Sequence, residues 1–123
     1  MGDLTEHFSE REFCCPCCKK LPKLTNLIYA LELLRYRCKK PLVISSGYRC
    51  VPYNSLIGGA ITSRHTMGTA ADVMCPEGMN IFTFFEYALE IPVFKNGGIG
   101  VYHNRLHLDI RGTEARWYKM ICL

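Results

Sequence analysis

The chain has no long hydrophobic run and only a small excess of basic over acidic residues. Its most apolar stretches, residues 27–34 and 80–89, contain polar side chains and are shorter than the roughly 20 residues that cross a bilayer. The 15 Lys and Arg residues, against 11 Asp and Glu, are scattered along the chain, which argues against a dedicated nucleic-acid-binding protein. These absences predict no transmembrane segment and no nucleic-acid partner.

The beginning of the chain also lacks the features of a secretory signal. The first seven residues include two acidic side chains and no apolar run, whereas such a signal is basic and then apolar. The 123 residues are 49% hydrophobic and 21% charged, the composition of an ordinary globular domain with one core. We therefore expect a single domain over residues 1–123, without a signal peptide, and we expect it to be a monomer.

Local patterns predict short helices and strands in an α+β fold. A Ser-x-x-Glu capping box at residues 9–12 predicts a short helix. Apolar residues at helical spacing predict longer helices over residues 24–38 and 81–88. Residues 50–69 are rich in Gly, Pro and Ser and are expected to form an irregular loop. Strands are expected at residues 42–45, 70–74, 98–103 and 106–111, the last two as a hairpin.

Cysteine is abundant: the chain has eight, four of them in the run Cys14-Cys15-Pro16-Cys17-Cys18. An even number suits disulfide bonds, but a chain without a secretory signal favours free thiols, so both states remain open. A structural zinc ion on this run is a further alternative, although ligands so close together do not match the usual pair-spacer-pair spacing. We expect structural rather than catalytic roles for these cysteines.

Chemistry-bearing residues concentrate in two segments. Side chains alternate along a strand, so His107, Asp109 and Arg111 share one face of the last predicted strand. In the other segment, His65 and Asp72 flank a glycine that permits a tight turn, which would bring them together. Two histidines and one carboxylate form the ligand set of many catalytic zinc sites. The alternatives are a hydrogen-bonded pair of His65 and Asp72 and a solvated strand face.

Three motifs in order resemble those of the zinc D-Ala-D-Ala carboxypeptidase family. They are Ser46-Gly47-Tyr48-Arg49, the segment from Ser63-Arg64-His65 to Ala71-Asp72, and His107-Leu108-Asp109-Ile110-Arg111. The family includes the vancomycin-resistance dipeptidases and phage L-alanyl-D-glutamate endopeptidases, and its fold is related to the hedgehog signalling domain. The resemblance, which runs from about Phe8 to Trp117, implies a hedgehog/DD-peptidase-like fold with a small antiparallel sheet and two or three helices.

The resemblance also implies roles for individual residues. Zn²⁺ would be the cofactor, with His65, Asp72 and His107 as its ligands. Ser63, Tyr48 and Arg49 would bind the substrate. Arg49 would in addition stabilise the polarised carbonyl, because a guanidinium suits both a carboxylate and a developing oxyanion.

The catalytic base is where this chain departs from the better-known members. They place an acidic residue three positions before the last zinc histidine, or a histidine two positions before it; here those positions hold Asn104 and Arg105. Asp109 lies two residues after His107 on the same strand face and is expected to be the base, with His103 as the second candidate. Alternatively, Asp109 fixes the tautomer of a ligating histidine.

The implied function is zinc-dependent hydrolysis of an amide bond in peptidoglycan stem peptides through a metal-activated water. The enzyme would be a D-Ala-D-Ala carboxypeptidase or an endolysin-type endopeptidase. A non-catalytic, zinc-binding, hedgehog-like interaction domain is the alternative, and a cysteine-rich binding protein without metal in the cleft is a third reading. A compact cell-wall hydrolase without a signal suits a phage gene whose product acts on the host cell wall.

Overall fold

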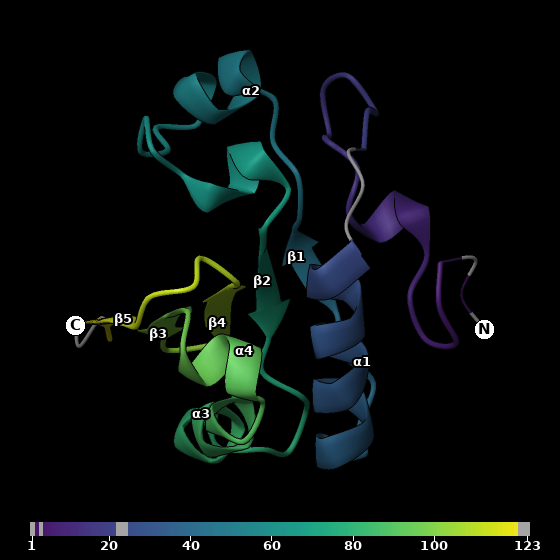
Figure 1. Cartoon of the computed structure of the whole chain (residues 1–123), viewed down its shortest axis with the longest axis vertical. Helices are drawn as coiled ribbons and strands as arrows, with labels where there is room; N and C mark the ends of the chain where they lie inside the picture. Colours follow the sequence, from purple (N-terminus) through teal and green to yellow (C-terminus); the bar gives the residue numbers. More distant parts are fainter. Residues whose placement is uncertain (1, 3, 22–24, 121–123) are drawn as a thin grey trace.

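The computed structural model describes residues 2, 4–21 and 25–120, which form an α+β fold around a five-stranded sheet (Figure 1). The strand order is β1-β2-β4-β3-β5. Neighbouring strands are antiparallel except β3 and β5, which run parallel. The strands are β1 (Ile44–Ser46), β2 (Ala70–Met74), β3 (Gly98–Tyr102), β4 (Arg105–Asp109) and β5 (Ala115–Lys119).

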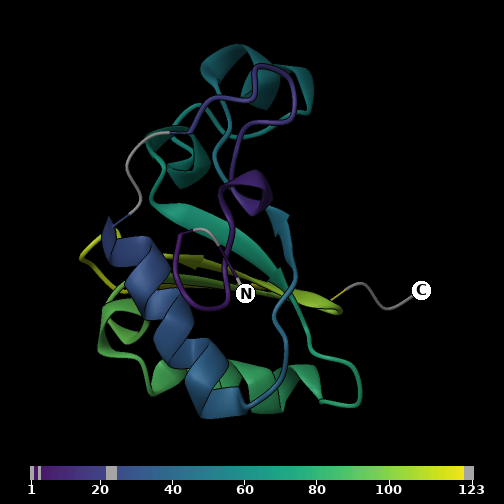
Figure 2. The same cartoon turned by 90° about the vertical axis from the view of Figure 1, so that its right-hand side faces the viewer.

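Helices lie on both sides of this sheet, as Figure 2 shows. The four α-helices are α1 (Thr25–Cys38), α2 (Val51–Leu56), α3 (Ile81–Leu89) and α4 (Pro92–Lys95), and the two 3-10 helices are η1 (Glu10–Glu12) and η2 (Arg64–Met67). Helices α1, α3 and α4 cover one face, whereas α2 and η2 lie beyond the other. Within the described part of the chain, no helix is both long enough and apolar enough to span a membrane.

The hydrophobic core lies between the sheet and the helices α1, α3 and α4. Alternate residues of the central strands face it, and all are fully buried: Ala71, Val73, Ile99, Val101, Leu106 and Leu108. They pack against fully buried leucines of α1 and the phenylalanines of α3 and α4, namely Leu27, Leu31, Leu34, Phe84 and Phe94. Because side chains alternate along a strand, this packing directs the intervening residues to the opposite face.

The N-terminal segment packs against the end of β1. The rings of Phe8 and Phe13 are buried and meet edge to face, with centroids 5.8 Å apart. Gly47 lies so close to this segment that a Cβ atom would come within 2.6 Å of the Phe13 Cα atom. A side chain at this position would therefore push the N-terminal segment away from the strand.

The expected long elements are confirmed. Helix α1 spans residues 25–38, α3 spans 81–89 and the hairpin of β3 and β4 is present; Leu24 lies outside the described residues. The capping box is also present, with the Ser9 amide donating to Glu12 Oε2 at 2.7 Å, although the helix that follows is a short 3-10 turn.

The expectation of an irregular loop over residues 50–69 is wrong, because this segment contains α2 and η2. Helix α2 buries only Asn54 and begins with a proline in its first turn, so it has no apolar stripe by which to recognise it. Strand β5 was not expected either: its residues are half-buried or exposed, without clear alternation. The expected α+β fold is nevertheless confirmed: in the described residues the sheet is mostly antiparallel, with only β3 and β5 parallel, although it carries four α-helices where two or three were expected.

We predict that replacing Phe84 with alanine lowers the free energy of unfolding by about 3–5 kcal/mol, because it leaves a large cavity in the core. The matched control is Phe82, which lies on the same helix but is 53% exposed. Phe82→Ala should change the free energy by less than about 0.5 kcal/mol. Denaturant unfolding measures both, and equal losses would contradict the orientation of α3.

Candidate active site

The candidate metal ligands lie on the sheet face opposite the core. Strand pairing places Asp72 of β2 beside His107 of β4, His107 beside Gly100 of β3, and Gly100 beside Trp117 of β5. Paired residues of neighbouring strands point to the same face of a sheet. These residues therefore form a row across four strands, and this row is the floor of the site.

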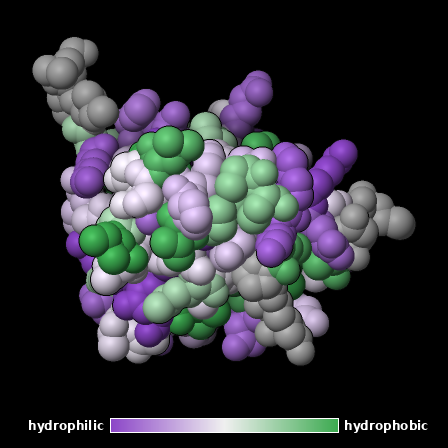
Figure 3. All heavy atoms as spheres, turned by 90° about the horizontal axis from the view of Figure 1, so that it is seen from above, coloured by the Kyte–Doolittle hydropathy of each residue, from purple (hydrophilic) through white to green (hydrophobic). Residues whose placement is uncertain are grey.

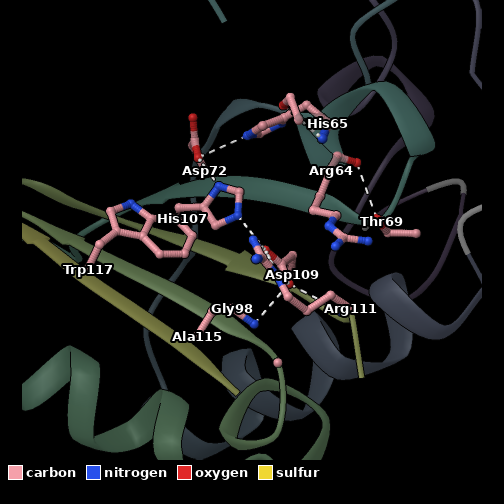
Figure 4. A network of polar contacts seen from close by, with 12 residues as sticks. Arg64, His65, Thr69, Asp72, Gly98, His107, Asp109, Arg111, Ala115 and Trp117 are labelled. Carbon is pink, nitrogen blue, oxygen red and sulfur yellow. Dashed lines mark hydrogen bonds and ion pairs between the residues drawn. The ribbon is translucent and has the colours of Figure 1, made fainter. Parts of the chain in front are cut away.

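His65 reaches this row from η2, as Figure 4 shows. The Ser63 hydroxyl accepts a hydrogen bond from the His65 amide at 3.2 Å and so caps the short helix. Gly68 ends it in the left-handed conformation, with φ 72°, which suits glycine. The chain then turns into β2, and the His65 ring is brought over Asp72.

Three ligand atoms converge at this point. Asp72 Oδ1 lies 3.2 Å from His65 Nε2 and 3.3 Å from His107 Nδ1. Around a tetrahedral ion with bonds of 2.0–2.1 Å, ligand atoms are about 3.3 Å apart. We call these three residues the histidine–aspartate group; its spacing suits a metal ion.

The hydrogen bonds of the two rings support the same conclusion. His65 Nδ1 lies 2.7 Å from the Gly47 carbonyl oxygen and His107 Nε2 lies 2.7 Å from Asp109 Oδ2, so each ring donates to an oxygen on its far side. A neutral imidazole has only one N–H. The second nitrogen of each ring, which faces Asp72, is then free to bind a cation.

Asp109 contacts the His107 ring on the side away from Asp72 and is itself fully buried. Its Oδ2 atom accepts from His107 Nε2 and from Arg111 Nη2, both at 2.7 Å. Its Oδ1 atom accepts from the Gly98 amide at 2.8 Å and from Arg111 Nε at 2.9 Å. A Cβ atom on Gly98 would clash with this carboxylate. Both oxygens of Asp109 are thus occupied by donors.

Electrostatics keep both aspartates ionised. Burial by itself would raise the pKa of Asp72, but the His107 and His65 rings, which donate to it when they are protonated and no metal ion is bound, outweigh burial and hold this pKa well below its usual range. The pKa of Asp109 is lowered in the same way: burial would raise it, but hydrogen bonds with His107 and Arg111 outweigh burial. Burial would lower the pKa of His107, and its bonds to the two carboxylates raise it instead. The site therefore concentrates negative charge around the rings, which favours a cation.

A cleft of about 420 Å³ opens above the histidine–aspartate group. Among the residues lining it, Asp72 is the one acidic side chain, and Ser63 contributes a hydroxyl. The basic side chains in the lining are Arg49, Arg64, Arg105, Arg111 and Lys119. A cleft with this charge suits a negatively charged ligand.

Arg49 is held beside the histidine–aspartate group by three contacts. Its Nε donates to Ser46 Oγ at 3.1 Å, its Nη1 donates to Asn54 Oδ1 at 3.2 Å, and its Nη2 lies 3.5 Å from Asp72 Oδ2. Asn54 is buried and donates in turn to the Ala60 carbonyl at 2.8 Å. Helix α2, absent from the sequence-based expectation, thus helps to position Arg49.

Three residues expected at the site, Tyr48, His103 and Asp109, are not in the cleft lining. Tyr48 is packed near the cysteine thiols: burial raises its pKa, and the charges of Cys18 and Cys50 raise it further. His103 is exposed in the turn between β3 and β4. Asp109 is buried, and the other expected residues line the cleft.

Trp117 is a site residue that the sequence reasoning missed. Its ring lies 4.9 Å from the ring of His107, measured between centroids, and the Arg111 guanidinium lies over it at 5.5 Å. Gly100 makes room for it, because a Cβ there would clash with the indole. The available signal was the pair of glycines, Gly98 and Gly100, on one face of a strand.

We predict that Asp109→Asn lowers the affinity for a divalent metal about 10- to 100-fold, as loss of a carboxylate behind a ligating histidine does. The amide keeps the shape but no longer favours the N–H at His107 Nε2. Titration against a chromophoric chelator measures the affinity, with His103→Gln as the control expected to match the native protein. An unchanged affinity in a folded Asp109→Asn variant would contradict this role.

Comparison with known protein families found a match. The model of the Peptidase M15 family matches residues 6–109, which is most of the chain. The match includes all three members of the histidine–aspartate group and confirms the resemblance seen in the motifs. No curated protein matches the chain. By the extent of the family match, the chain belongs to the Peptidase M15 family.

Proposed function

We propose that this protein is a zinc-dependent peptidase that hydrolyses an amide bond in peptidoglycan stem peptides, acting as one monomeric domain over residues 1–123. The observation that carries the proposal is the histidine–aspartate group at the floor of a basic cleft, in a chain of a peptidase family. Two imidazoles and one carboxylate with an open fourth position are typical of catalytic zinc. When bound, the ion would polarise the carbonyl and acidify a water molecule.

Arg49 has the chemistry to bind the reacting peptide. Its guanidinium is fixed by Ser46 and Asn54 and lies beside Asp72, so it lines the cleft next to the metal ligands. A fixed cation at this position stabilises negative charge that develops on a carbonyl oxygen. It also suits a terminal carboxylate, which a guanidinium can bind through two hydrogen bonds.

The charge of the cleft supports a substrate that carries carboxylates. Stem peptides of peptidoglycan carry several, whereas the cleft lining has five basic side chains and one acidic residue, which is itself a metal ligand. Gly58, Gly59 and Ala60 form one wall, and such small residues let a peptide backbone approach closely. Ser63 offers a hydroxyl on the same side.

We assign Asp109 the role of orienting His107 rather than that of the base. Its carboxylate is fully buried and receives donors on both oxygens, so a proton arriving there would break existing hydrogen bonds. His103, the second candidate, is exposed beside the cleft residues Tyr102 and Arg105. Kinetic measurements distinguish an orienting role of Asp109 from a role as the general base.

With saturating zinc, we predict that Asp109→Asn keeps turnover within about 10-fold of the native enzyme, because the metal site is then filled. Loss of a general base would instead cost about 100-fold or more with zinc bound. Steady-state hydrolysis of a synthetic stem peptide, with zinc content measured on the same samples, gives both numbers. A 100-fold loss in zinc-loaded Asp109→Asn would assign the base to Asp109, and the same loss in His103→Gln would assign it to His103.

Digestion of purified cell wall tests the proposed function itself. We expect mass spectrometry of the released muropeptides to show one cleaved amide bond, chelation to stop the reaction, and added zinc to restore it. A zinc-loaded, folded protein that cleaves none of the stem peptides would contradict the proposal. That outcome would favour the non-catalytic, hedgehog-like interaction domain.

Arg49→Gln should lower kcat/KM by about 100-fold, because it removes a donor from the developing charge. The matched control is Arg37→Gln, which breaks the exposed ion pair of Arg37 with Glu90 far from the cleft. The control should retain activity within about twofold, as expected for a surface pair. Equal activity of the two variants would remove Arg49 from the proposed site.

A further inference from the structure

A second group of metal-type ligands lies outside the cleft, where the N-terminal loop meets the beginning of α2. Figures 1 and 2 both show this loop beside the segment that leads into α2. Three cysteines come from the loop and one from the residue before the helix. We call them the thiol cluster: Cys15, Cys17, Cys18 and Cys50.

The sulfur positions suit a metal ion rather than a disulfide. Sγ of Cys50 lies 3.3 Å from Sγ of Cys17 and 3.5 Å from Sγ of Cys15, and the last two are 3.7 Å apart. All four sulfurs lie within 4.8 Å of one another. A disulfide requires about 2.05 Å, whereas sulfurs around a tetrahedral zinc ion, at about 2.3 Å from it, are about 3.8 Å apart.

Backbone amides point at the sulfurs, as they do in thiolate metal sites. The Cys50 amide donates to Cys15 Sγ at 3.4 Å, and the amides of Cys17 and Cys18 also donate to it. The Lys20 amide donates to Cys18 Sγ. Such hydrogen bonds stabilise the charged thiolate and orient it toward the ion.

The loop is folded so that its sulfurs face one point. The Lys19 amide donates to the Cys15 carbonyl at 2.8 Å, and the Cys15 amide donates to the Lys20 carbonyl at 2.9 Å, so the turn is closed at both ends. Lys19 has a left-handed backbone, with φ 61°, which is unfavourable for a non-glycine residue. Cys15 and Cys18 form a C-x-x-C pair, the spacing of zinc ligands.

Other cysteines in the described residues lie apart from this cluster. The Cys14 thiol donates to the Arg11 carbonyl, and the Cys75 thiol donates to the Met79 carbonyl at 3.1 Å. Cys38 belongs to α1. These three provide control positions for an experiment.

We infer that the thiol cluster binds one Zn²⁺ ion as a structural tetrathiolate site. The ion would close a loop between the N-terminal segment and Cys50, which directly follows Arg49 in the sequence. It would thereby fasten the N-terminal segment to the turn that carries Arg49, and would do so without taking part in hydrolysis. The role is separate from that of the zinc in the cleft.

Metal content of the whole chain tests this inference, independently of activity. Native protein purified without chelator should hold about two zinc ions, and a His65→Ala, His107→Ala variant should hold about one. Cys17→Ser and Cys50→Ser should each lose the remaining ion in that background. The controls Cys14→Ser and Cys75→Ser should keep it.

X-ray absorption on the double histidine variant decides the ligands, even if the cysteine variants fail to fold. We expect a shell of sulfur alone at about 2.3 Å. A zinc-free double histidine variant, a shell containing nitrogen, or a disulfide between Cys17 and Cys50 in freshly alkylated protein would overturn the inference. None of these results bears on whether the cleft hydrolyses peptides, so the two proposals fail separately.

Discussion

The pairing of β2 with β4 is the constraint on which the site depends. It sets Asp72 opposite His107 and Ala70 opposite Asp109, while Val73 and Leu106 face the core. A shift of one residue in this register would turn the histidine into the core and a leucine into the cleft. Burial of the apolar face therefore fixes the positions of the candidate metal ligands Asp72 and His107, and stability and site geometry share one cause.

A line of polar contacts between acidic and basic side chains extends from this pairing toward both ends of the site. Arg111 binds Asp109, Asp109 binds His107, His107 meets Asp72, and Asp72 meets Arg49. Buried charges are tolerated when each has a partner of opposite sign. These contacts supply such partners and leave two ring nitrogens directed at Asp72, so that a metal ion could complete the arrangement.

The region that contains α2 and η2 is organised differently from the side of the sheet that packs against α1, α3 and α4. Large apolar side chains around α2 are exposed, among them Val51, Leu56 and Ile61, and Figure 3 shows hydrophobic side chains scattered among hydrophilic ones on this face. Hydrogen bonds, such as those of Arg49 and Asn54, hold this part together instead of a core. A metal ion on the thiol cluster would add the crosslink that packing does not provide here.

The sequence alone determined the elements whose patterns are local: the helices α1 and α3, the capped turn at residues 9–12 and the alternation of the last hairpin. Its motifs also singled out His65, Asp72 and His107, which lie together in the structure and within the range of the family match. Tertiary structure decided which way each side chain is turned. Asp109 faces the back of His107 because Gly98 leaves room for it, and Cys50 joins three cysteines more than thirty positions earlier. Such contacts depend on strand register and chain reversal, which residues far apart in sequence set together and which no local pattern records.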